Sequence, residues 1–183
     1  MAFVMYKGLM ASEDVKMMNV SVDFQDGGVS ASVKDGSFVV LGDKIADTTY
    51  SASGKDYNVY KATAPTAVTD KVVVVDIAGV SQGSIAGNTY RIGVKLFNLQ
   101  SYAGEPVRAR RMMVGDSFYL GSDNFSGAVT VGQYAILAEN ATTLAPNASV
   151  PGSGFAVKIQ ESIDFTAGQV ADGKLYLCEV VQL

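Results

Sequence analysis

The sequence predicts an all-β fold, a small β-barrel or sandwich with an irregular N-terminal arm. The 183 residues fit one domain of ordinary size. No long stretch repeats apolar residues with the helical period, whereas several short stretches alternate apolar and polar residues. Nineteen glycines and a charged fraction of only 17% are typical of short strands joined by tight turns. We therefore expect a β-barrel or sandwich domain over residues 36–183, preceded by an arm over residues 1–35.

The predicted arm differs from the rest of the chain in composition. Five of the seven methionines lie in the first 18 positions, among apolar residues that follow no regular spacing. Methionine is flexible and polarizable, so this segment is suited to fill an uneven groove on a neighbouring surface. An arm that folds back onto its own domain is the alternative. If the arm grips a partner, the expected contact residues are Phe3, Met5 and Met10.

The strand signals follow one another through the remaining chain. They lie at residues 20–24, 37–41, 72–77, 89–99, 133–138, 155–160 and 174–182. Most alternate between an apolar and a polar face. The run 72–77 is almost continuously β-branched, and the run 174–182 is apolar on both faces, which predicts a central strand. Glycine-containing turns such as Asp26-Gly27-Gly28 and Asp172-Gly173 separate them.

The composition excludes several kinds of chemistry. Histidine is absent, which removes Ser-His-Asp and Cys-His nucleophiles and histidine metal sites. The single cysteine, Cys178, cannot form an internal disulfide and lies in an apolar run. A net charge of -4 argues against a nucleic-acid partner, and no apolar stretch is long enough for a membrane span. We expect no enzyme, cofactor, metal, nucleic-acid partner or membrane association, and no secretory signal at the N-terminus.

Three of the four arginines cluster at Arg108, Arg110 and Arg111. In an extended strand, Arg108 and Arg110 point to one side and Arg111 to the other. Two neighbouring guanidinium groups are able to fork onto carboxylates. A solvated strand face and a protein–protein contact both account for the cluster. We take these three arginines as candidate interaction residues.

Several short motifs share their order with a known family. They are DGSFVVL at 35–41, YNVYK at 57–61, the run 72–77, GEPVR at 104–108, VGDSF at 114–118, VGQY at 131–134 and FAVKI at 155–159. In the order of these motifs the chain resembles head-decoration, or capsid cement, proteins of tailed bacteriophages. The Met-rich segment has no counterpart in that pattern.

The resemblance implies a non-enzymatic structural protein of the virion. Such a protein would be made in the host cytoplasm, bind the outer capsid surface, often as a homotrimer, and clamp subunits of the major capsid protein together. A tail-tube or neck component is an alternative, which would show a long inserted hairpin and assemble into rings or tubes. A carbohydrate-binding module is another, which would need exposed tyrosines such as Tyr50, Tyr57 and Tyr60 in a row.

Overall fold

The protein is all-β, as predicted. The computed structural model describes residues 4–6, 19–46, 59–77, 83–85, 88–90, 100–167 and 170–183. Within these residues the elements are β1 (Val4–Tyr6), β2 (Asn19–Asp26), β3 (Val29–Ser30), β4 (Phe38–Lys44), β5 (Val59–Thr63), β6 (Val72–Val75), β7 (Gly83–Ile85), β8 (Asn88–Tyr90), β9 (Val107–Arg111), β10 (Ser117–Gly121), a 3₁₀ turn η3 (Ser122–Asn124), β11 (Tyr134–Leu137), β12 (Leu144–Asn147), β13 (Ala156–Ala167) and β14 (Val170–Gln182). No helix in this part of the chain has the length and apolarity to span a bilayer.

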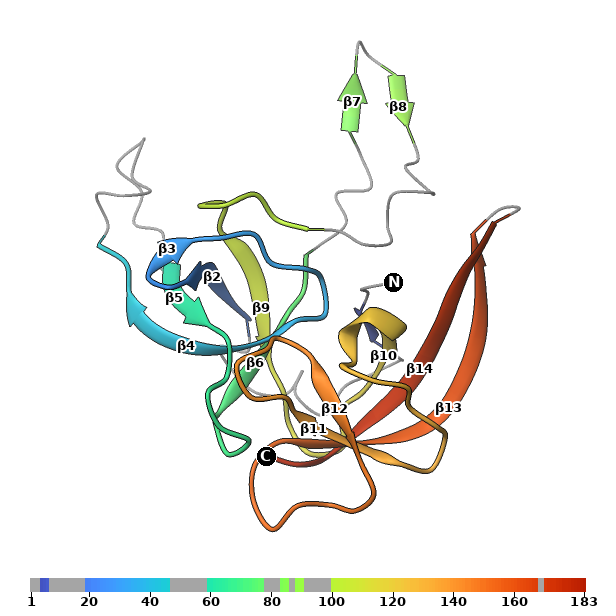
Figure 1. Cartoon of the computed structure of the whole chain (residues 1–183). Helices are drawn as coiled ribbons and strands as arrows, with labels where there is room; N and C mark the ends of the chain where they lie inside the picture. Colours follow the sequence, from blue (N-terminus) through green and yellow to red (C-terminus); the bar gives the residue numbers. More distant parts are fainter. Residues whose placement is uncertain are drawn as a thin grey trace.

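Five strands close into a barrel, seen at the upper left in Figure 1. Their order is β2-β5-β4-β6-β9, and β9 returns to pair with β2. The β2–β5 pair is parallel and the other neighbours are antiparallel. A barrel of few strands has a narrow interior. Small and β-branched side chains fill it: Val22, Val33, Val39, Ala62, Val73, Val75, Val107 and Ala109.

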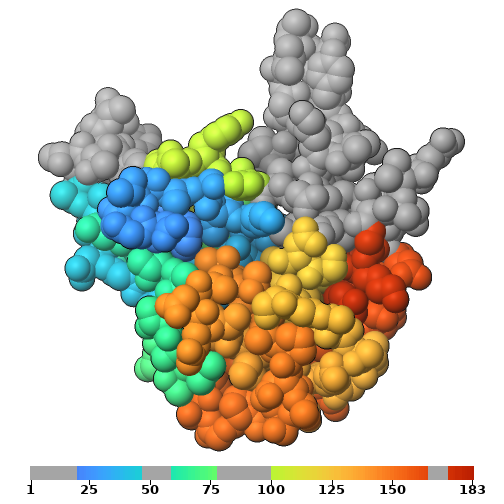
Figure 2. Space-filling view, in the orientation of Figure 1, coloured from blue at the N-terminus to red at the C-terminus, as the bar shows by residue number. Residues whose placement is uncertain are grey.

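A second sheet packs against the outside of the barrel. Its order is β1-β10-β14-β13-β11-β12, with every neighbouring pair antiparallel. Figure 2 shows residues of this sheet, in yellow and orange, in broad contact with the blue and green barrel residues. The inner face of the sheet supplies most of a second apolar core, which includes Phe118, Leu120, Leu137, Leu144, Phe155, Val157, Ile159, Cys178 and Val180. The expected central strand is confirmed, because β14 lies between β10 and β13.

Strands β4 and β6 belong to both cores. Phe38 and Val74 are register partners whose side chains enter the core between barrel and sheet. Their neighbours Val39 and Val73 are also register partners and fill the barrel interior. The Phe38 ring lies 5.2 Å from the ring of Phe155, measured between centroids. Burial on both faces explains why the sequence of β6 is a continuous run of valines.

Buried polar groups join the barrel to the second sheet. Asn124 in η3 donates a hydrogen bond from Nδ2 to the carbonyl oxygen of Asp35 (2.9 Å) and accepts one at Oδ1 from the N–H of Gly121 (3.2 Å). The carboxylate of Asp35 accepts a bond from the N–H of Ile77 (2.9 Å). Gly36 has a φ of 73°, and a Cβ there would lie 2.6 Å from Nδ2 of Asn124. This junction therefore requires glycine at position 36.

The segment expected to form an arm divides into different parts. Residues 19–26 form β2, which pairs with β5 and β9 and completes the barrel. The alternation of Val20, Val22 and Phe24, visible in the sequence, gives this segment a face that the barrel interior buries. Residues 19–26 and 29–30 thus belong to the barrel sheet rather than to a separate arm, and Val33 lies in the barrel core. Near the N-terminus, β1 pairs with the edge of β10 in the same chain.

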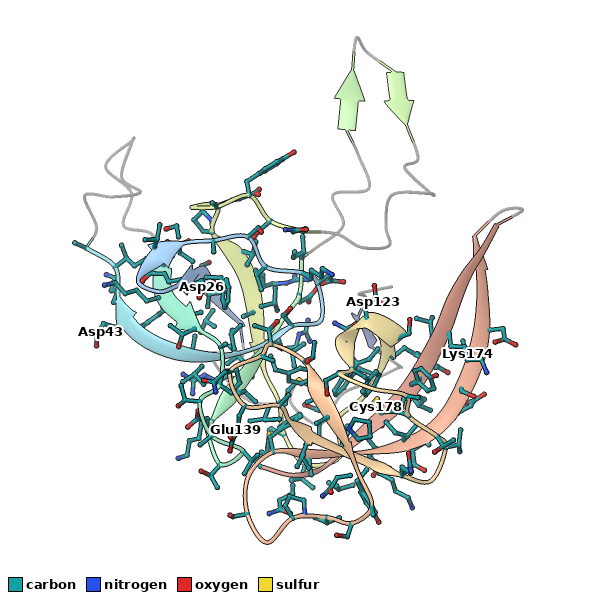
Figure 3. The ribbon with its side chains drawn as sticks, viewed as in Figure 1. Asp26, Asp43, Asp123, Glu139, Lys174 and Cys178 are labelled. Carbon is teal, nitrogen blue, oxygen red and sulfur yellow. The ribbon has the colours of Figure 1, made fainter. Side chains whose placement is uncertain are left out.

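The hairpin of β13 and β14 extends beyond its neighbours. Strand β11 pairs only with β13 residues 156–158, and β10 only with β14 residues 175–179. Residues 164–167 of β13 and 170–174 of β14 therefore pair only with each other among the described strands. In Figure 1 this ribbon leaves the body toward the upper right, and Figure 3 places Lys174 on it.

Truncation of Phe38 tests the shared core. Phe38→Ala removes a fully buried ring from the core between barrel and sheet. We expect the free energy of unfolding to fall by about 3–5 kcal/mol, measured by urea denaturation. The control Val131→Ala changes a side chain that is 53% exposed and should shift stability by no more than about 0.5 kcal/mol. Equal effects would show that β4 is not shared between two cores.

Two glycines with nearly the same backbone conformation give a matched test of packing. Gly154 and Gly132 have φ values of 92° and 90°. A Cβ at Gly154 would overlap the carbonyl oxygen of Val68, whereas nothing lies within 4 Å of one at Gly132. Both alanine variants incur a similar backbone cost, about 1–2 kcal/mol. We expect Gly154→Ala to have the clearly lower melting temperature, and equal melting temperatures would contradict the close approach.

Candidate interaction surfaces

The arginine cluster lies on β9, where its members separate as the alternation predicts. Arg108 donates a hydrogen bond from Nη2 to Oδ2 of Asp76 (2.6 Å), and Nη2 of Arg110 lies 3.9 Å from the same oxygen. The side chains of Arg108 and Arg110 are 42% and 16% exposed, and that of Asp76 is 11% exposed. Asp76 also donates its backbone N–H to the carbonyl oxygen of Arg108 (2.9 Å). These two arginines therefore share one buried carboxylate of their own chain.

Asp76 gives Arg108 and Arg110 a structural role within their own chain. The sequence shows it only as a lone acid in an apolar run. In the fold it lies directly after β6, beside β9, and partly neutralises Arg108 and Arg110. Reversing both arginine charges would bring three carboxylates together at a partly buried site, so that variant would disturb folding as well as binding.

Arg111 lies apart from this ion pair, at the mouth of the barrel opposite Val73. It lines an open cleft of about 540 Å³. We call this the mouth cleft. Its lining is largely apolar with charged groups among it: Val40, Leu41, Asp70, Lys71, Val72, Val73, Arg111, Met112, Phe155 and Leu183. Such a lining suits an apolar side chain accompanied by negative charge.

The acid of the mouth cleft is engaged by its own loop. The Asp70 carboxylate accepts hydrogen bonds from the backbone N–H groups of Thr66 (2.8 Å) and Ala67 (3.0 Å). These bonds hold the pKa of Asp70 below its ordinary value of 3.8, and the bond from Ala67 has a larger effect than the one from Thr66. Asp70 is therefore ionised at neutral pH and directed at its own backbone, while Lys71 and Arg111 are exposed.

A second surface element is the turn that precedes β9. Tyr102 is 81% exposed, more than any other large apolar residue in the described part of the chain. Its N–H donates to Oε2 of Glu105 (3.0 Å), and its carbonyl oxygen accepts from the N–H of Glu105 (3.1 Å). Val33 and Ser101 exchange two further hydrogen bonds, of 2.9 and 3.0 Å. The turn is therefore fixed to the barrel while its tyrosine faces solvent.

Sequence reasoning did not single out Tyr102 or the mouth cleft. Residues 102–106 are recognisable as a turn, but exposure of one aromatic residue on that turn is a tertiary property. The remaining arm candidates lie elsewhere. Met5 is in β1 on the second sheet, in register with Tyr119, whereas Arg108, Arg110 and Arg111 are on the barrel. Phe3 and Met10 lie outside the described residues, as do Tyr50 and Tyr57; Tyr60 is half-buried in β5.

The other chemically distinctive groups are structural. Cys178, labelled in Figure 3, is fully buried in the core between barrel and sheet, and burial raises the pKa of its thiol. The fully buried Asp116 accepts a hydrogen bond from the N–H of Met113 (2.8 Å) and stabilises the turn before β10. No group of three or more metal-binding side chains occurs among the residues that the structure describes.

Comparison with models of protein families, with curated proteins and with solved structures finds no match in any of the three. What the protein does is therefore inferred from its fold, its surface and the resemblance of its sequence motifs.

The ion pair at Asp76 is a structural element that can be tested. Asp76→Asn leaves Arg108 and Arg110 side by side without the buried negative charge. We expect the free energy of unfolding to fall by about 1–3 kcal/mol. The matched control is Asp164→Asn, because Asp164 pairs at 4.0 Å with Lys174 but both are well exposed. That change should cost less than about 1 kcal/mol. Equal losses in chemical denaturation would assign the arginine pair to a solvated face.

Proposed function

We propose that the protein is a non-enzymatic structural protein of a tailed-phage virion, a capsid decoration or cement protein. It would bind the outer surface of the head and stabilise contacts between subunits of the major capsid protein. The order of sequence motifs supports this proposal. The proposed site of action is the capsid surface, after synthesis in the host cytoplasm.

One structural observation gives this proposal its main support. The molecule is a two-core body in which the most exposed aromatic side chain among the described residues is presented on a turn closed by its own hydrogen bonds. Tyr102 is 81% exposed, and Glu105 closes its turn through both side chain and backbone. Tyrosine is enriched where proteins bind proteins, and a preorganised turn loses little conformational freedom on binding. A protein that is repeated over a lattice gains further from multivalency.

The β13–β14 hairpin favours the second candidate, a tail-tube or neck component. Its outer part extends beyond strands β10 and β11, and one edge of β13 there has no partner among the described strands. Open strand edges can pair with a strand of a neighbouring subunit, which is how a hairpin links subunits into rings. The hairpin joins two neighbouring strands in the middle of the second sheet, however, rather than interrupting the sheet as an insertion would.

Reconstitution tests the proposal. Purified protein is mixed with heads that lack it, and binding is measured by cosedimentation and by the temperature at which the heads rupture. We expect saturable cosedimentation and a higher rupture temperature. The absence of both would refute the cement function.

The same preparation distinguishes the second candidate. Purified protein alone is concentrated and examined by electron microscopy. A cement protein should give small discrete particles, whereas a tube protein should give stacked rings or tubes. Tubes that no longer form when residues 164–174 are replaced by an Asn-Gly turn, in a variant that keeps its circular dichroism and melting transition, would support the tail-tube candidate.

A further inference from the structure

We propose that copies of this protein associate head to tail, with the turn that carries Tyr102 in one copy seated in the mouth cleft of the next. The inference deepens the proposed function, on which its role in the virion rests, but it concerns a contact between copies that can be tested without heads. Two surfaces carry it, and they lie at opposite ends of β9.

The first surface, which we call the knob, comprises Val29, Tyr102 and the acids Asp26 and Glu105. Val29 and Tyr102 are 71% and 81% exposed. They belong to adjoining turns, because a Cβ built on Gly104 would lie 4.0 Å from Cβ of Ser30, next to Val29. Figure 3 labels Asp26 at this end of the barrel.

The knob is negatively charged and well held. Residues 25–33 and 100–107, which form both turns, include the acids Asp26 and Glu105; the flanking cations are Lys34, which forms a bridge with Gln100, and Arg108, which is paired with Asp76. In addition to the bonds at Glu105 and Ser101, Nε2 of Gln100 donates to Oγ of Ser32 (2.5 Å). The two turns are therefore hydrogen-bonded to each other, and these bonds hold in place the turns that carry the exposed apolar side chains. This is the form expected of a protein-binding anchor.

The mouth cleft has the complementary properties. Its floor is apolar, with Val72, Val73 and Phe155, and its volume of about 540 Å³ is in the range that accommodates a small ligand or a large side chain. Lys71 and Arg111 are exposed and belong to its lining. The acidic side chain there, Asp70, accepts bonds from the backbone of its own loop. An acidic knob with an aromatic tip therefore matches the cleft in both polarity and charge.

The positions of the two surfaces determine the kind of assembly. The knob turn leads into Val107, at the start of β9, and Arg111 ends the strand at the cleft. Because the strand rises about 3.3 Å per residue, the two surfaces are separated along the barrel and cannot meet within one copy. The contact joins different patches of the two copies, so it is heterologous and gives a closed ring when its rotation closes.

Sedimentation equilibrium of single variants tests the contact. Tyr102→Ala removes the anchor, and Arg111→Glu places an acid opposite the acidic knob. Both side chains are exposed, so folding should be unchanged, as circular dichroism can verify. We expect each variant to self-associate at least about tenfold more weakly than the parent protein. The control Val114→Ala, at an exposed site on another turn, should match the parent. A monomeric parent, or variants that associate like the parent, would overturn the proposal.

Mixing the two variants tests the head-to-tail geometry. The Tyr102→Ala copy keeps an intact cleft, and the Arg111→Glu copy keeps an intact knob. An equimolar mixture should therefore form a 1:1 heterodimer and nothing larger. A mixture that stays monomeric would show that the contact is not heterologous and would overturn the proposal.

Head binding separates this inference from the proposed function. If Tyr102→Ala loses cosedimentation with heads but self-associates like the parent, the knob contacts capsid protein rather than a second copy. That outcome overturns the head-to-tail contact and leaves the cement function standing. If both variants lose self-association while the parent still binds heads, both conclusions hold.

Discussion

The structure depends on two strands that are buried on both faces. Strands β4 and β6 pair with each other, direct Val39 and Val73 into the barrel, and direct Phe38 and Val74 toward the second sheet. Barrel and sheet therefore share a wall, and neither can shift without repacking the other. The buried bonds of Asn124 and Asp35 join the same two parts at a second place. The result is one stiff body from two sheets.

Closure of the barrel depends on the most distant pairings. Strand β2 lies parallel to β5 and antiparallel to β9, so residues near the N-terminus complete a sheet whose last strand ends at Arg111. A closed sheet leaves fewer open edges to pair with other chains. On the second sheet, β1 covers the edge of β10, whereas the outer part of β13 has no partner on one side among the described strands. Contacts with other molecules are therefore expected at defined places.

The three arginines of β9 differ in their surroundings. Asp76 holds Arg108 and Arg110 against the barrel, while Arg111, one residue farther along β9, turns to the opposite side and reaches the mouth cleft. The period of two along a strand thus divides one cluster of arginines into a structural pair and a surface cation. Tyr102, before the other end of this strand, lies on a turn closed by Glu105.

The sequence by itself determined the all-β class and the identity of several strands, because a period of two in Val20, Val22 and Phe24, or an unbroken valine run in β6, reports how many faces are buried. It also determined that Arg108 and Arg110 share a side. Only the tertiary structure decided that residues 19–26 and 29–30 belong to the barrel sheet, that Asp76 receives both arginines, and that Tyr102 is exposed on a fixed turn. Those outcomes depend on pairing between residues far apart in the chain, and local periodicity carries no information about which strands become neighbours.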